Sequence, residues 1–303
     1  MRHVVATWGY VVMLPWQPFL DYVFMQRALL GCTAIALGAT PIGVFLIARR
    51  MSLIGDAMAH AILPGAAVGF VVSGLSLGAM TLGGIVAGLL VAVLTGAVSR
   101  ATRLQEDASL AAFYLISLAL GVLLVSLKGS NVDLMHVLFG SVLALDDAAL
   151  FLLCTIATLT LSVLALLYRP LVLECVDPQF LRTVGRSSLL THLLFLALVV
   201  LNLVAGFQAL GTLMAVGIMI LPAAAARFWA RRLAPMLLIA LAVALLASVI
   251  GLWLSYRFDL PSGPTIILAA GSVYLLSLLL GPEDSLAANA RPRRQRTATG
   301  APP

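Results

Sequence analysis

Charge is scarce in this sequence. Only 10% of its 303 residues are charged, whereas 62% are hydrophobic and the mean hydropathy is +1.11. A soluble domain carries about 25% charged residues, so this chain has too few charges to cover a surface exposed to water. The scarcity excludes a soluble domain and predicts an all-α polytopic membrane protein.

Lysine is almost absent, because Lys128 is the one lysine among 18 basic residues. The phosphate-binding motif GxxxxGK[ST] does not occur, so we expect no ATP hydrolysis by this chain and no enzymatic activity of its own. The net charge of +6 could suggest a nucleic-acid partner. The arginines, however, stand at the ends of apolar runs, as residues that fix membrane orientation do, so no nucleic-acid partner is expected.

Metal-binding and catalytic motifs of soluble proteins are missing as well. The three cysteines form no CxxC pair, and the four histidines form no HExxH motif. These absences exclude a zinc finger and a zinc metalloprotease. We expect the cysteines to be small packing residues and no metal or cofactor to be bound permanently.

Long apolar runs are what the sequence has instead. A membrane-spanning helix needs about 20 mostly apolar residues. Nine such runs occur, but the run at 210–226 is short, so the sequence predicts eight or nine spans. Residues 131–145 are too short to span and are expected to form a re-entrant or outer surface helix. The runs are 28–48, 57–74, 79–98, 109–127, 148–168, 189–207, 210–226, 234–256 and 264–280.

Basic residues predict the orientation of these spans. With nine crossings, 14 of the 18 basic residues fall on one side, which is therefore the cytosolic side. The N-terminus is then outside, the C-terminus inside, and the chain a multi-pass protein of the bacterial inner membrane. We predict an interfacial segment over 1–20, without a signal-peptide cleavage site, a permease domain over 21–281, and a basic, disordered tail over 282–303.

An acidic residue and a histidine lie inside the second run, in SLIGDAMAHAILPG. Asp56 and His60 are four residues apart, so their side chains share one helix face. A carboxylate and an imidazole together suit Zn²⁺, Mn²⁺ or Fe²⁺. If the segment from Arg50 onward is helical, Asp56 lies roughly 10 Å from the inner surface, where a charge must face a cavity or a partner.

A structural role for this pair is equally open. Asp56 could accept a hydrogen bond from His60, or it could cap the helix as its N-terminal residue. Two ligands are also too few for a tight metal site. Further ligands would have to come from other spans, from water or from a second subunit.

A second acidic residue and histidine, Asp133 and His136, lie on the predicted outer helix. With Lys128, Asp146 and Asp147 they give the outer side its polar character. A solvated rim is the simpler interpretation. An outer vestibule that passes a cation inward is the alternative.

The longest polar stretch between spans is ECVDPQFLRTVGRSS, residues 174–188. It predicts a short cytosolic helix in which Asp177 is the cap, Pro178 opens the first turn and Gly185 ends the helix. Phe180 and Leu181 lie four and three positions before Val184, so the three side chains would form one apolar face. That face either lies on the membrane or docks on a soluble subunit.

Several separated stretches resemble the permease subunits of bacterial ABC importers for zinc, manganese and iron. The resemblance runs from about residue 20 to 280 and follows the family's order. It is carried by RRMSLIGDAMAHAILPG (49–65), DLMHVLFGSVL (133–143), DPQFLRTVG (177–185), ALGTLMAVGIMILPAAAAR (209–227) and DLPSGPTIIL (259–268).

The resemblance implies a dimeric permease that works with two cytosolic ATPase subunits and an extracytoplasmic metal-binding protein. The stretch that ends at Gly185 is similar to the family's ATPase-coupling helix. The GDxxxH element, here Gly55, Asp56 and His60, is similar to its intramembrane metal-contacting site. The resemblance assigns no role to His136.

We therefore expect import of a divalent transition metal by alternating access, with ATP bound on the partner subunit. An ion-coupled secondary transporter and an ABC permease for a metal chelate are the alternatives. The sequence distinguishes neither the metal nor a dimer of identical chains from one of different chains.

Overall fold

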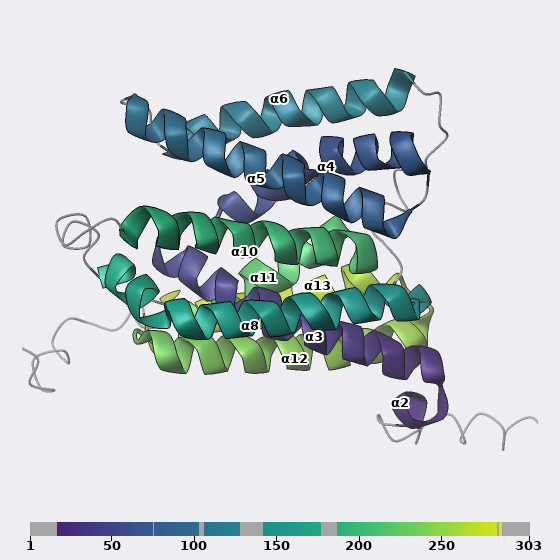
Figure 1. The fold of residues 1–303 in the computed structure, drawn as a ribbon. Coiled ribbons are helices and arrows are strands. Elements are labelled where there is room, and N and C mark those ends of the chain that lie inside the picture. Colours follow the sequence, from purple (N-terminus) through teal and green to yellow (C-terminus); the bar gives the residue numbers. More distant parts are fainter. Residues whose placement is uncertain are drawn as a thin grey trace, which may run out of the picture.

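A computed structural model describes residues 17–74, 76–102, 106–127, 142–176, 187–283 and 285–286. Within these ranges the chain is helical and no strand occurs (Figure 1). The elements are α2 (Gln17–Asp21), α3 (Val23–Ala48), α4 (Ile54–Ser73), α5 (Leu77–Ala101), α6 (Glu106–Leu127), the 3-10 turn η1 (Val142–Ala144), α8 (Asp147–Val176), α10 (Ser187–Leu210), α11 (Thr212–Arg227), α12 (Leu233–Phe258) and α13 (Ser262–Leu280).

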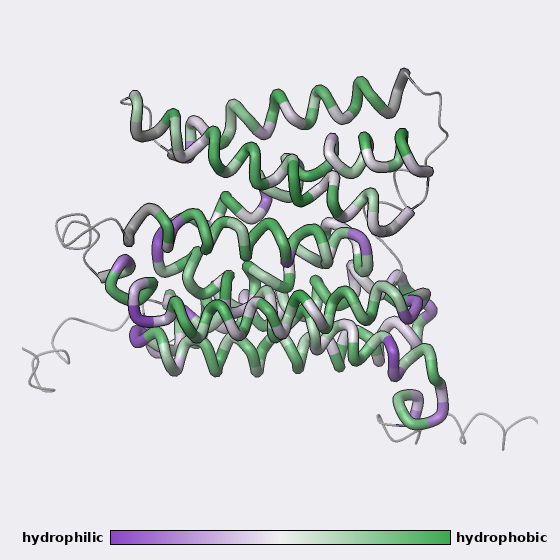
Figure 2. The backbone as a smooth tube through the Cα atoms, in the orientation of Figure 1, coloured by the Kyte–Doolittle hydropathy of each residue, from purple (hydrophilic) through white to green (hydrophobic). Residues whose placement is uncertain are grey.

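Eight of the described helices are long and apolar enough to cross a membrane, and α11 is a shorter apolar helix of 16 residues. This confirms the expected all-α architecture of eight or nine spans. Figure 2 shows hydrophobic residues along the helices and hydrophilic residues gathered mainly near their ends. The helix α8 is longer than the predicted 148–168, because it continues through Pro170 to Val176.

The short helix α11 begins at a tight turn. Gly211 connects it to α10 with a φ of 90°, a conformation that a residue with a Cβ rarely adopts. The turn is enclosed by protein, since Leu210 is fully buried and Thr212 is 8% exposed. A helix that starts below the surface of the bundle does not need to span the whole bilayer.

The helix α3 is the most enclosed span. In an apolar stretch of 18 residues, 72% of its residues are buried, against 17% for α6. It runs parallel to α11, and the two backbones nearly touch. A Cβ added at Gly43 would overlap the carbonyl oxygen of Met219. Such close approach through small residues is how helices pack in lipid, where no hydrophobic force draws them together.

Two buried polar groups in the bundle find partners on neighbouring helices. Pro222 has no N–H, so the carbonyl of Ile218 lacks its helical donor, and the hydroxyl of Thr40 donates to it at 3.2 Å. The Asn202 amide of α10 donates to the Thr160 hydroxyl of α8 at 2.7 Å. Both contacts lie in the bundle interior, where lipid would supply no partner.

The helices α4, α5 and α6 form one layer beside the rest of the bundle (Figure 1). The contact between α4 and α5 is as close as that between α3 and α11, because a Cβ at Gly65 would overlap the carbonyl oxygen of Gly83. The start of α4 also touches α11, where Gly55 packs against Met219 and Ile220. The helix α4 therefore joins the two parts of the bundle.

Ion pairs mark the two ends of the bundle. At one end, which we call the inner rim, Arg49 pairs with Glu174 and Arg231 pairs with Glu283. At the opposite end, the outer rim, Arg27 pairs with Asp147. The inner rim holds the ends of α3, α8 and α13 and the starts of α4 and α10. The names follow the orientation that the arginines predict.

We predict that Gly43→Ala destabilises the purified protein by about 3 kcal/mol, because the added methyl group overlaps backbone that cannot move aside. Thermal unfolding in detergent measures the loss. The matched control is Gly271→Ala in α13, where an added Cβ meets no atom within 4 Å. That change should alter stability by less than about 1 kcal/mol. Equal stability of both variants would contradict the close packing of α3 on α11.

Candidate metal centre

The start of α4 is set by the way α3 ends. Arg50 has a φ of 59°, the N–H of Arg50 donates to the Ile47 carbonyl at 3.1 Å, and that of Met51 donates to the Leu46 carbonyl at 2.9 Å. These two bonds form a Schellman motif. The chain turns through residues 49–53, and Ile54 begins the next helix.

This turn corrects the predicted depth of Asp56. Residues 50–53 are not helical, so Asp56 is the third residue of α4 and lies about one helical turn above the inner rim rather than 10 Å above it. His60 lies one turn further into the bundle.

The two side chains share one face of α4, as expected. Their nearest atoms, His60 Nε2 and Asp56 Oδ1, are 3.9 Å apart, which is too far for a hydrogen bond. The capping alternative is wrong, because the N-cap residue is Leu53 and it forms no side-chain cap bond. Neither structural role proposed for Asp56 is present, and its side chain is 68% exposed.

His60 is held from the side of α6. Its ring centroid lies 6.1 Å from that of Tyr114, and Nδ1 is buried without a hydrogen-bond partner in the described part of the chain. The nitrogen that faces Asp56 is Nε2. Nε2 and the Asp56 carboxylate lie on the same face of α4, so both can bind a single cation placed on that face.

The rest of α4 packs against α6. Ser117 donates from α6 to the Ala61 carbonyl at 3.0 Å, and a Cβ at Gly121 would lie 3.1 Å from the Pro64 nitrogen. Pro64 removes the helical donor of the His60 carbonyl. With α5 and α6 packed against other faces of α4, the face that carries Asp56 is the one left uncovered.

One chain offers two ligands at this position. Across the described ranges, no group of three or more His, Cys, Asp or Glu side chains could hold a metal ion. A four-ligand site at Asp56 and His60 would therefore need donors from water or from another molecule.

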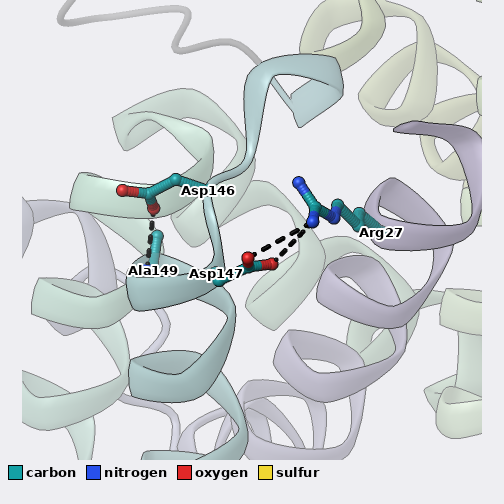
Figure 3. Close-up of polar contacts among 4 residues, drawn as sticks. All are labelled: Arg27, Asp146, Asp147 and Ala149. Atoms are coloured by element: carbon teal, nitrogen blue, oxygen red, sulfur yellow. Dashed lines mark hydrogen bonds and ion pairs between the residues drawn. The ribbon is translucent and has the colours of Figure 1, made fainter. Parts of the chain in front are cut away.

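The outer polar residues have structural partners where the structure describes them. Asp146 accepts a hydrogen bond from the Ala149 N–H at 2.8 Å and so caps α8, and Asp147 pairs with Arg27 at 2.9 Å (Figure 3). The candidate vestibule residues Asp133 and His136 lie outside the described residues. So does the whole predicted coupling stretch, with Asp177, Pro178, Phe180 and Gly185.

A buried polar cluster at the inner rim was missed by the sequence analysis. Arg49 Nη2 lies 2.7 Å from Glu174 Oε1 and 3.0 Å from His192 Nδ1. The Arg49 and Glu174 side chains are 8% and 9% exposed. From the sequence, Arg49 serves only as an orientation signal. The available signal was Glu174, a charged residue close to the end of an apolar run. The sequence alone does not indicate that it pairs with a residue 125 positions away.

Comparison with known proteins places this fold. The model of the ABC 3 transport family matches residues 21–281. The chain belongs to the ABC 3 transport family. The expected resemblance to ABC importer permeases and the multi-pass membrane location are confirmed.

Relatives match over most of their length. The chain is 33% identical to the manganese import system permease protein ScaB of Streptococcus gordonii over 265 residues, 87% of this chain and 94% of ScaB. It is 31% identical to the manganese transport system membrane protein MntC of Listeria monocytogenes over 275 residues, 90% and 96% of the two chains.

Solved structures share the fold. A chain of PsaBC from Streptococcus pneumoniae, in complex with Fab, superposes with a TM-score of 0.79 at 30% identity and covers 91% of this chain and 99% of its own. An inward-facing metal-chelate type ABC transporter gives 0.67 at 18% identity, over 86% and 87% of the two chains. At that identity the second match shows the fold alone.

We predict that Asp56→Ala changes the free energy of unfolding by less than about 1 kcal/mol, because an exposed carboxylate without a hydrogen bond contributes little. Glu174→Ala should cost about 3–5 kcal/mol, because it leaves Arg49 buried without its counter-ion. Thermal unfolding of the purified variants compares them. A loss at Asp56 as large as that at Glu174 would show that Asp56 is a structural residue.

Proposed function

We propose that this chain is the permease subunit of an ATP-driven importer whose substrate is Mn²⁺. Two observations support manganese: ScaB and MntC are named manganese permeases, and a carboxylate with an imidazole is a donor set that Mn²⁺ accepts. Zn²⁺ and Fe²⁺ accept the same donors, so the metal is decided by experiment. The single observation that carries the proposal is the open Asp56–His60 face of α4 in an ABC 3 family chain.

The proposed transport site contains Asp56 and His60 from two copies of the chain. A carboxylate that is 68% exposed on a membrane-spanning helix needs a polar partner, because lipid offers none. A second copy placed across a two-fold axis would bring its own Asp56 and His60 to the same point. Four protein ligands would then surround the passing cation.

The partners follow from the proposed importer. A cytosolic ATPase subunit supplies the ATP hydrolysis, and an extracytoplasmic binding protein delivers the metal. We assign ATPase docking to residues 177–185, which connect α8 to α10 at the inner rim. The outer residues Asp133 and His136 remain candidates for the entrance.

In the proposed mechanism each residue has a limited task. The Asp56 carboxylate offsets the cost of removing water from a dication, and His60 Nε2 fixes the position of the ion without adding charge. The contact with Tyr114 holds the His60 ring in place. Affinity must stay modest, because a site that binds too tightly cannot release its ion. Closure of the ATPase subunits moves residues 177–185 and switches the side of the membrane to which the site opens.

We predict that cells with the complete transporter accumulate Mn²⁺ when this metal alone is restored to depleted medium. The Asp56→Ala/His60→Ala variant should lose at least about tenfold of this uptake, equivalent to about 1.4 kcal/mol or more. Mass spectrometry of whole-cell metal measures both, at equal membrane abundance of the chain.

The matched control is Asp107→Ala, which removes another exposed carboxylate from the first turn of a spanning helix and should leave uptake unchanged. If the wild type takes up another metal and not Mn²⁺, that metal is the substrate and the manganese assignment is wrong. Full uptake by the double variant would exclude the Asp56–His60 pair from the path.

We predict that two copies meet at α4. In a chain whose cysteines at 32, 154 and 175 are replaced by alanine, Asp56→Cys should be linked into dimers by a short thiol-reactive crosslinker. Leu166→Cys, on an 80% exposed position of α8, should stay monomeric on a denaturing gel. A crosslink at 166 and none at 56 would place the dimer interface elsewhere.

A further inference from the structure

We propose that Arg49, Glu174 and His192 form a coupling clamp, which transmits movement from the ATPase-docking segment to the metal-binding face of α4. The inference rests on the proposed function, because it assigns positioning residues to that transport cycle. We assign no metal contact to these three side chains, which act by connecting helix ends.

The location of the clamp is the first argument. Glu174 lies in the last turn of α8 and His192 in the second turn of α10, so the clamp holds the two helices that lead into and out of residues 177–186. Arg49 is the C-cap residue of α3. Only four residues separate it from Ile54, the first residue of α4. One side chain thus connects both ends of the docking segment to the start of the helix that carries Asp56 and His60.

The rigidity of the attachment is the second argument. Arg49 is held by Glu174 at 2.7 Å, by His192 at 3.0 Å, and by the Phe195 ring, whose centroid lies 5.1 Å from Cζ. A buried charge cannot leave its counter-ion without a large desolvation penalty. The helix ends therefore cannot slip past one another as apolar surfaces can.

Aromatic rings join the same three helices deeper in the bundle. Phe45 of α3 makes edge contacts with Tyr168 of α8 at 6.2 Å and with Phe195 of α10 at 6.4 Å. Phe45 and Phe195 are fully buried. A displacement of the end of α8 or the start of α10 is therefore passed to the end of α3 rather than absorbed by loose packing.

The connection from Arg49 to α4 is also stiff. The Schellman bonds of Arg50 and Met51 lock the turn, and Ile54 is 1% exposed. Gly55 then packs on Met219 and Ile220 of α11. The turn is short, internally bonded and anchored at both ends, so movement of Arg49 moves the first turn of α4, where Asp56 lies.

The test uses the complete transporter in proteoliposomes, with Mn²⁺ uptake and ATP hydrolysis measured together. The deciding variant is Arg49→Met/Glu174→Met, which replaces both ions by unbranched apolar side chains. Removing both partners of a buried ion pair is often neutral for folding. We expect the variant to assemble and hydrolyse ATP while Mn²⁺ transported per ATP falls at least about tenfold, whereas a merely structural pair would leave this ratio unchanged.

Two controls make the result specific. Arg231→Gln breaks an exposed ion pair at the same rim, with side chains 66% and 31% exposed, and should keep the wild-type ratio. If the double methionine variant does not reach the membrane, Arg49→Lys decides, because it retains the charge but loses the planar guanidinium that lies over the Phe195 ring. It should lower transport per ATP at least about threefold, and an unchanged ratio would overturn the clamp.

The outcomes separate the clamp from the proposed function. Suppose that Asp56→Ala/His60→Ala loses Mn²⁺ uptake while Arg49→Met/Glu174→Met keeps the wild-type amount of Mn²⁺ transported per ATP. That result would overturn the clamp alone. Absence of Mn²⁺ uptake by the wild-type transporter would overturn the proposed function, and the clamp with it.

Discussion

A polar group inside this protein can find a partner only in protein or in a water-lined cavity, because the surrounding hydrocarbon offers none. The rest of the structure follows from that constraint. The Ile218 carbonyl, left open by Pro222, is bonded by Thr40 of another helix. Asn202 bonds Thr160 across α8 and α10. The charge of Arg49 is buried only where Glu174, His192 and Phe195 meet it.

Asp56 departs from this constraint. It lies in a membrane-spanning helix, yet its side chain is 68% exposed and its nearest basic atom is 3.9 Å away. The contrast with Glu174, a carboxylate of the same bundle that is 9% exposed and directly paired, separates the two roles. A paired carboxylate holds helices together, whereas one left open is available to a passing cation or to another subunit.

The sequence predicted the spans well, because helix length in a bilayer depends on apolar run length, a local property. It also placed Asp56 and His60 on one face, since helical spacing is local too. It placed Asp56 too deep, because the turn at Arg50 depends on backbone bonds that residue types alone do not reveal. The Arg49–Glu174 pair joins residues 125 positions apart, and spacing carries no signal over that distance.

The enclosure of α3 has a consequence for biosynthesis. It is the first long helix that the structure describes, yet its Thr40 hydroxyl donates to the carbonyl of Ile218, 178 positions later. At about 5–20 residues per second, the ribosome needs roughly 10–35 s to deliver that partner. During this interval the glycine-lined face of α3 is uncovered in lipid, and Arg49 lacks its counter-ion until Glu174 is made, 125 positions after it. The centre of the bundle is therefore inserted first and completed last, and a nascent chain cut before α11 leaves that centre without its cover.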